Sequence, residues 1–365
     1  MNKNPFKFGS IVDDPYFTNR TREIEKVRSV VESHNHLILI SPRRYGKSSL
    51  VFKVVGKLKR PVIALDLQLI TSPEDLAAQL LKRIYRVFPA EKIRQFVRQF
   101  RIIPTISLNP VNNEVDISFQ PSSGQSPVLE DVLNLVEKLS NEKRRAIVVF
   151  DEFQEIQKID PELGRQLRSV MQHHQFVNYV FLGSQESLIR MIFERKKSPF
   201  YHFGILFPLG KIPRDEFMEY LVDRLTPVSI NPGRLAEEIL NVTDCHPYYT
   251  QQLAFMVWED LERNEPEANG VKQALNELTS THDMDYERLW NNFNKTDKKL
   301  LIGLASSSFA PLSESFNRTY GTGATSTVFS SLKRLMINGY VIKNDTKYEI
   351  DDPFFKIWLQ QRRVR

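Results

Sequence analysis

The chain has 365 residues, of which 41% are hydrophobic, and it carries a formal net charge of +6 and a single cysteine, Cys245. This length and apolar content are typical of a globular protein of two or three domains, and one cysteine excludes an intrachain disulfide framework. No run reaches the roughly 18–20 apolar residues of a membrane span. The first five residues lead into no long apolar stretch, so we expect no signal peptide and predict a soluble, cytoplasmic protein.

The positive charge is concentrated near the C-terminus. Residues 293–365 contain 12 Lys and Arg against 6 Asp and Glu, whereas the rest of the chain balances at 38 of each. A basic segment of this kind is typical of a surface that binds a polyanion such as nucleic acid. A solvated positive face explains the same composition, and the sequence leaves both interpretations open.

The N-terminal region predicts a helix, then a strand, a tight loop and a second helix. Residues 17–23 open the first helix, and the apolar run 36–40 predicts the strand. After the loop at 41–49, Leu50, Val54 and Leu58 recur at helical spacing. Strand, loop and helix in this order form the context in which phosphate-binding loops occur.

The loop matches the phosphate-binding pattern G-x-x-x-x-G-K-[ST], except that Ser41 occupies the first glycine position. Gly46 lets backbone N–H groups approach phosphate, Lys47 supplies charge for the β- and γ-phosphates, and the Ser48 hydroxyl is placed for a magnesium ion. Ser49 lies in the first helical turn, where free N–H groups favour an anion. Apolar residues ahead of the loop either wall a nucleotide base or belong to the core.

The next segment predicts a strand at 61–67 and a helix that begins at Ser72-Pro73. Residues 101–127 are different, because short alternating apolar runs surround Asn-Pro and Asn-Asn turn signals. We predict that these residues form a β-hairpin insertion that ends in the flexible stretch 121–127.

A buried-type apolar strand at 145–152 ends in two acids, Asp151 and Glu152. Parallel strands covered on both faces have continuous apolar runs, and ligands bind at their carboxyl ends. We therefore expect Asp151 to bind magnesium, directly or through water, and Glu152 to orient and polarise an attacking water. An acidic turn after a strand explains this pair alone, but not its combination with the loop at 41–49.

Two further strands are predicted at 177–185 and 205–209. The first ends in polar Ser184 and Gln185, which can reach a γ-phosphate or the attacking water. Arg190 and Arg195 follow as candidates for sensing γ-phosphate charge, although such arginines are more often solvated. Helices are predicted from residue 213 and within 232–264.

From about residue 293 the pattern changes to three helices, at 296–304, 313–320 and 325–338, followed by two short strands. This order is typical of a winged helix, whose third helix serves for recognition. Such modules bind DNA phosphates or dock proteins, and the sequence leaves both open. The candidate nucleic-acid-binding residues are Lys333 and Arg334 on the third helix, and Lys343 and Lys347 on the wing.

Together these residues resemble the prokaryotic archaeal-type ATPases of the AAA+/STAND group, relatives of the replication-initiator ATPases. The resemblance implies an α/β P-loop core with strand order 5-1-4-3-2 at 1–212, a helical lid at 213–292 and a winged helix at 293–365. It also implies binding of ATP and Mg²⁺, with Glu152, Lys47 and Ser184 as catalytic residues, and Ser48 and Asp151 at the metal. The implied nucleotide-binding residues are Phe17, Arg20, Ser41, Arg43, Arg44, Tyr45, Gly46, Lys47, Ser48, Ser49, His246 and Pro247.

Two departures from that family bear on activity. Residues 199–203 lack the arginine that many relatives carry there, and Tyr248-Tyr249 replaces the lid arginine of initiator ATPases. We therefore expect slow, switch-like ATP hydrolysis, coupled to double-stranded DNA through the winged helix and to a nucleotide-dependent oligomer. The alternatives are a signalling or defence ATPase whose winged helix binds protein, and a structural nucleotide binder without turnover.

Overall fold

The computed structural model describes residues 3–108, 115–119, 127–263, 267–307, 309–344 and 347–364. It divides into two compact units. The core unit comprises Thr21–Ser41 and Lys47–Leu209, and the C-terminal unit comprises Met1–Arg20, Pro42–Gly46 and Gly210–Arg365. The N-terminal segment and residues 42–46 therefore group with the C-terminal half, whereas the prediction placed them in a core at 1–212. The further division of the C-terminal half into lid and winged helix stays a prediction.

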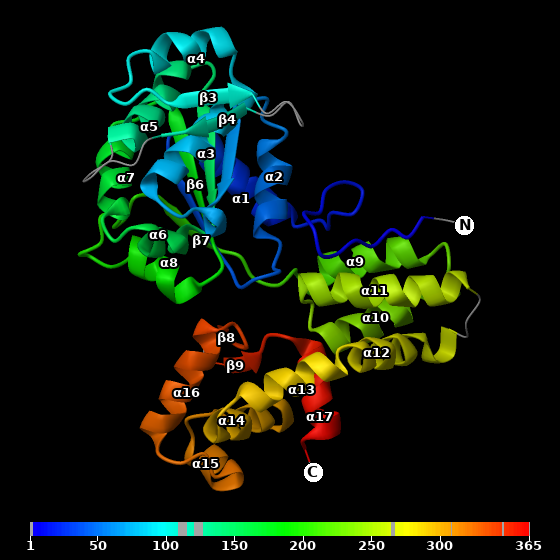
Figure 1. Ribbon diagram of the computed structural model, residues 1–365. Helices are drawn as coiled ribbons and strands as arrows, with labels where there is room; N and C mark the ends of the chain where they lie inside the picture. The colour runs from blue at the N-terminus through cyan, green and yellow to red at the C-terminus, as the bar shows by residue number, and fades with distance from the viewer. Residues whose placement is uncertain are drawn as a thin grey trace. The chain divides into compact units, whose positions relative to one another are not determined.

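The core unit is built on a five-stranded parallel sheet (Figure 1). When only the five strands of this sheet are counted along the chain, they lie in the order 2-3-4-1-5. Read from the other edge this is 5-1-4-3-2, which confirms the predicted order. The register pairs Ile40 with Gly183 and Asp66 with Asp151, so the carboxyl ends of the strands lie at one edge. The strands, in spatial order, are β2 (Val62–Asp66), β5 (Ala146–Asp151), β6 (Val177–Gly183), β1 (Leu37–Ile40) and β7 (Ile205–Pro208).

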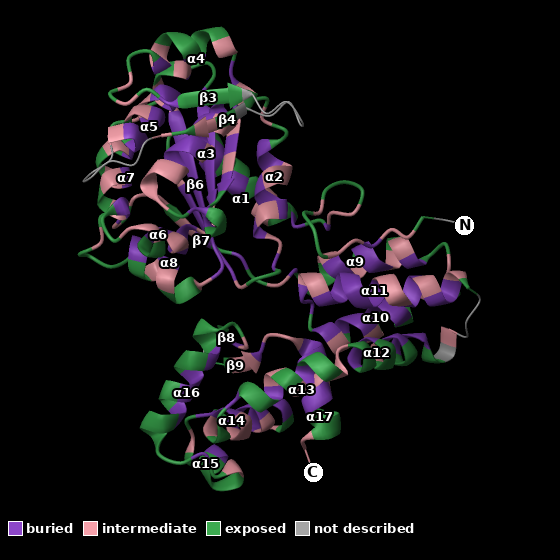
Figure 2. Cartoon of the chain, viewed as in Figure 1, coloured by how far each residue is buried: buried purple, intermediate pink, exposed green. Residues whose placement is uncertain are grey.

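Helices cover the sheet, which explains why its central strands are mostly apolar. Every residue of β1 and β6 is buried, and β5 is buried up to its last residue, Asp151 (Figure 2). Helix α3 contacts α5, α5 contacts α7, and α1 contacts α2. The helices of this unit are α1 (Thr21–Glu32), α2 (Lys47–Val55), α3 (Pro73–Val87), α4 (Ala90–Val97), α5 (Pro127–Leu139), α6 (Ile156–Ile159), α7 (Leu163–Met171) and α8 (Glu186–Phe193).

The predicted hairpin insertion is present. Strands β3 (Thr105–Leu108) and β4 (Val115–Ser118) pair antiparallel, and β4 contacts α3. The Asn-Pro and Asn-Asn turn signals lie outside the described residues, as does most of the stretch 121–127.

The C-terminal unit is mainly helical and ends in the predicted three helices and two-stranded ribbon (Figure 1). One continuous apolar core joins its helices to the ribbon. None of the described helices is long and apolar enough to cross a membrane. The first five helices are α9 (Arg214–Leu225), α10 (Pro232–Thr243), α11 (Pro247–Glu262), α12 (Gly270–Thr281) and α13 (Asp283–Asn292). They are followed by α14 (Lys295–Ser306), α15 (Glu314–Tyr320), α16 (Thr325–Ile337), β8 (Val341–Asn344), β9 (Lys347–Ile350) and α17 (Pro353–Arg362).

Candidate functional site

The first part of the candidate site lies at the carboxyl edge of the core sheet. Ser48, in the first turn of α2, donates a hydrogen bond from Oγ to Asp151 Oδ2 at 2.7 Å, although 103 residues separate them in the chain. The buried Lys47 donates from Nζ to the carbonyl oxygen of Ser41 at 3.3 Å. The structure thus brings together the two sequence motifs that predicted phosphate and metal binding.

The electrostatics around Asp151 favour a cation. Burial raises the pKa of the Asp151 carboxyl, and the neighbouring charge of Glu152 raises it further, whereas the Ser48 hydrogen bond and the charge of Lys47 lower it. A carboxylate and a hydroxyl oxygen this close are a donor pair that Mg²⁺ accepts, because this ion binds few protein ligands and keeps several waters. Ser48 and Asp151 therefore fit the metal that the sequence predicted.

Glu152 is held by two donors. Ser184 Oγ and Gln154 Nε2 both donate to Glu152 Oε2, each at 2.5 Å. Glu152 has a φ of 52°, a left-handed conformation that non-glycine residues adopt at a cost. The carboxylate is consequently fixed through one oxygen, while Oε1 is engaged by neither of these donors.

Gln154 was not among the predicted site residues, yet it contacts Glu152. It is buried, and its Oε1 has no hydrogen-bond partner among the described residues. A Cβ at Gly183 would lie 3.0 Å from this Oε1 and 2.2 Å from Ile189 Cγ1, so only glycine fits where β6 approaches Gln154. In the sequence, Gln154 is only a glutamine two residues after Glu152. This spacing by itself does not predict that the two side chains are in contact.

The arginines proposed as charge sensors differ in their surroundings. Arg190 makes ion pairs with Glu186 and Glu194 on either side of it in the chain, at 2.9 and 3.0 Å. These i,i+4 pairs occupy its guanidinium along α8. Arg195 lies just beyond the end of α8 and is exposed.

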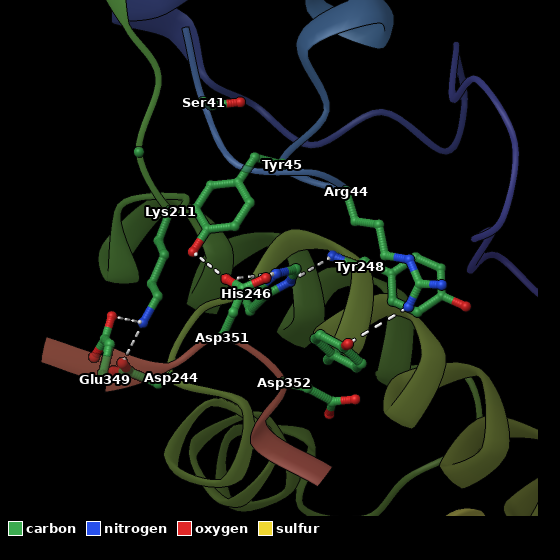
Figure 3. A network of polar contacts seen from close by, with 12 residues as sticks. Ser41, Arg44, Tyr45, Lys211, Asp244, His246, Tyr248, Glu349, Asp351 and Asp352 are labelled. Carbon is green, nitrogen blue, oxygen red and sulfur yellow. Dashed lines mark hydrogen bonds and ion pairs between the residues drawn. The ribbon is translucent and has the colours of Figure 1, made fainter. Parts of the chain in front are cut away.

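The segment 42–46 of the phosphate loop belongs to the C-terminal unit and is described with that unit (Figure 3). Arg44 and Gly46 have φ values of 66° and 86°, which curl the backbone. The Arg44 guanidinium lies over the Tyr248 ring, 4.5 Å from its centroid, and Nη1 is 3.4 Å from the Tyr249 hydroxyl. Tyr45 is buried and donates to Asp351 Oδ1 at 3.1 Å.

Arg20 and Phe17, both predicted to bind nucleotide, occupy different settings. Arg20 is buried and donates from Nη2 to the carbonyl oxygens of Tyr45 at 3.0 Å and Gly210 at 3.1 Å. Arg20 therefore stabilises the backbone at Tyr45 and Gly210 by hydrogen bonds within the C-terminal unit. Phe17 is half-buried, and Arg43 is exposed.

His246 and Pro247 begin helix α11. His246 Nδ1 accepts a hydrogen bond from the Tyr248 backbone N–H, and the His246 ring lies edge-on to Tyr45 at 4.7 Å. Burial lowers the pKa of His246 to about 3, with smaller contributions from nearby cations. The imidazole is therefore neutral at pH 7.

The candidate nucleic-acid-binding residues divide into two groups. Lys333, Lys343 and Lys347 are exposed. Arg334 instead pairs with the buried carboxylate of Asp297 on α14 at 2.6 Å, and Ser331 donates to the same carboxylate. Arg334 consequently ties α16 to α14, a role that the sequence did not predict.

Helix α16 also carries an exposed apolar group. Phe329, Met336 and Ile337 keep 55%, 37% and 46% of their surface exposed. Met336 and Ile337 lie two helical turns beyond Phe329, with Lys333 one turn after it, so these side chains share one face of the helix. A DNA-recognition surface is expected to be polar and basic, and this face is mixed.

Comparisons with known proteins agree with this architecture. A family model described as "Probable winged helix domain" matches residues 284–361. The chain is similar to the solved structure of the Walker-type ATPase PABY2304 of Pyrococcus abyssi, with 20% identity, a TM-score of 0.68 and coverage of 98% of this chain and 99% of that chain. It is also similar to the ORC2 protein of Aeropyrum pernix in ADPNP-ADP complexes, with 14% identity, a TM-score of 0.55 and coverage of 96% and 94%. No curated protein matches the chain.

The chain shares the fold of these two solved structures, and its core sheet has the strand order predicted for an AAA+-like P-loop fold. The C-terminal part, residues 284–361, is a winged helix domain. Both confirm the fold predicted from the sequence.

Proposed function

We propose that this protein is an ATP-binding, slowly hydrolysing molecular switch with a winged-helix output module. The observation that carries the proposal is the convergence of Lys47, Ser48, Asp151, Glu152 and Ser184 at one edge of the parallel sheet. The similar Pyrococcus abyssi protein is a Walker-type ATPase, and the similar Aeropyrum pernix structure is one of ADPNP-ADP complexes, which supports a nucleotide as ligand here.

Each residue has a role that its position supports. Lys47 and the amides that follow Gly46 bind the phosphates, and Ser48 and Asp151 hold Mg²⁺, which neutralises phosphate charge when bound. Glu152, steadied by Ser184 and Gln154, accepts a hydrogen bond from the attacking water through its remaining oxygen and takes up the water proton. Ser184 connects the same carboxylate to the end of β6.

We expect slow turnover because the chain lacks an arginine that related ATPases carry. Phosphoryl transfer depends mainly on positive charge placed around the transferred group. His246 is neutral at pH 7, and Tyr248-Tyr249 stands where initiator ATPases carry an arginine. Without an arginine at this position of the chain, we expect turnover below the roughly 1–100 s⁻¹ that is typical of kinases.

The direct test is titration of the full-length protein with ATP and ADP, with and without Mg²⁺, alongside phosphate release. We expect saturable binding of both nucleotides and phosphate release only with Mg²⁺, because Ser48 and Asp151 offer the metal ligands. Absence of binding would overturn the proposal. Binding without release under every condition would favour the structural nucleotide binder.

The partner of the winged helix has two candidates. Lys333, Lys343 and Lys347 are exposed and basic, which supports double-stranded DNA. The exposed Phe329, Met336 and Ile337 on the same module support a protein partner, as in a signalling or defence ATPase, because apolar side chains gain by burial in a protein interface. Nucleotide state would set which partner surface is accessible, with oligomerisation as a further consequence.

Salt-dependent DNA binding by the full-length protein separates these candidates. If the three lysines each neutralise one phosphate, the slope of log affinity against log salt is about −2.7, and affinity falls about 40-fold between 50 and 200 mM salt. Replacing the three lysines by alanine should abolish this binding, whereas Phe329→Ala with Met336→Ala should leave the slope unchanged. Failure to bind duplex DNA with ATP, ADP or no nucleotide would favour the protein partner.

A further inference from the structure

We propose that Asp351, in the winged-helix region more than 300 residues beyond the phosphate loop, is a positioning residue that holds the loop segment 42–46 in its nucleotide-binding shape. The inference rests on the proposed nucleotide binding and adds a site of regulation to it. Asp351 directly follows β9, two residues before α17, so any movement of the winged helix moves this carboxylate.

The loop needs external support because its backbone is curled. A backbone that alternates right-handed and left-handed conformations turns successive N–H groups inward and forms an anion-binding concavity. Gly46 adopts its φ of 86° without steric cost, but Arg44 is a non-glycine residue with a φ of 66°. Such a conformation persists where the surrounding structure over-determines it.

Other residues of the C-terminal unit support the segment 42–46 through three groups of contacts. Arg20 donates to the Tyr45 carbonyl oxygen at 3.0 Å and fixes the backbone. The rings of Tyr248 and Tyr249 hold the Arg44 guanidinium. Asp351 accepts a hydrogen bond from the Tyr45 hydroxyl at 3.1 Å, and this bond connects the winged-helix region to the segment 42–46 (Figure 3).

A second hydrogen-bond donor lies close to the Asp351 carboxylate. His246 Nδ1 accepts the Tyr248 N–H, so the proton of the neutral ring lies on Nε2. That Nε2 is buried, has no hydrogen-bond partner among the described residues and lies 3.8 Å from Asp351 Oδ1. The carboxylate thus has a second donor just beyond hydrogen-bond distance, and a small shift would let it bond to His246 at the start of α11.

By linkage, a contact that shapes the loop for nucleotide must itself be strengthened when nucleotide binds. ATP or ADP would therefore fix the winged helix through Tyr45 and Asp351, and an event that pulls the winged helix away would weaken nucleotide binding. This gives the switch a defined path from the phosphates to its output module.

The test compares nucleotide affinity in full-length variants. Asp351→Ala and Tyr45→Phe should each weaken ATP and ADP binding about tenfold, as expected for one buried hydrogen bond. The double variant should be no weaker than Asp351→Ala alone, because both changes remove the same contact. Asp351→Asn should restore near-normal affinity, since its amide oxygen still accepts the Tyr45 hydroxyl.

Two further measurements distinguish positioning from general stability. Glu349→Gln is the matched control, because Glu349 lies two residues before Asp351, on β9, and pairs with Lys211, outside the loop segment. It should leave nucleotide affinity unchanged. In steady-state hydrolysis, Asp351→Ala should raise KM for ATP with little change in kcat, since Glu152 and its donors are untouched.

The outcomes separate this inference from the proposed function. Absence of nucleotide binding by the wild-type protein would overturn both. Normal wild-type binding, with Asp351→Ala within about twofold of it, would overturn the positioning role alone, because a lost buried hydrogen bond costs more than that. Additive effects of Asp351→Ala and Tyr45→Phe would overturn it as well, even if both variants bind weakly.

Discussion

Glu152→Gln is expected to bind MgATP with near-normal affinity and to hydrolyse it about 10²–10⁴-fold more slowly than the wild-type protein. The amide keeps an oxygen that can accept the hydrogen bonds of Ser184 and Gln154, so the side chain stays in place. It loses the carboxylate that takes up a proton from the attacking water. Phosphate release under single-turnover conditions, with ATP affinity measured in parallel, checks both halves of this expectation.

The control for this substitution is Glu142→Gln, which makes the same chemical change at an exposed position in the turn before β5. It should leave turnover unchanged. A Glu152→Gln variant as active as the wild-type protein would show that another group positions the water, and Glu152 would then serve only to shape the end of β5.

Lys47→Ala is expected to weaken ATP binding by about 2–3 kcal/mol, or about 30- to 150-fold in affinity, through loss of a buried charge-assisted contact to phosphate. Lys47 is 6% exposed, and its ammonium group is already held at the Ser41 carbonyl oxygen, so little ordering is needed when nucleotide arrives. Calorimetric titration of ATP and ADP in the presence of Mg²⁺ measures the loss directly.

Lys57→Ala is the matched control, because Lys57 follows the same helix α2 and is exposed. Its removal changes the net charge equally without touching the loop. Equal affinities for Lys47→Ala and the wild-type protein would contradict the assignment of residues 41–49 as a phosphate loop, whatever the outcome at Glu152.

The sequence alone determined the fold and the ends of the strands that build the site. Continuous apolar runs predicted the strands β1, β5 and β6, because a strand covered on both faces must be apolar throughout. Asp151 and Glu152 were recognisable because they follow such a run directly, and Lys47 because it sits between a strand and a helix. These signals are local, so they survive without knowledge of the neighbouring segments.

Only the tertiary structure decided how the site is held. Gln154 donates to Glu152 Oε2. Ser184, which directly follows the neighbouring strand β6, donates to the same oxygen, and neither segment alone indicates this contact. The packing of α16 on α14 pairs the exposed Arg334 with Asp297, a contact that the sequence did not predict. Tyr45 and Asp351 meet across 306 residues of sequence. A hydrogen bond depends on where two groups lie in space, and for groups this far apart in sequence the packing of whole elements sets that distance.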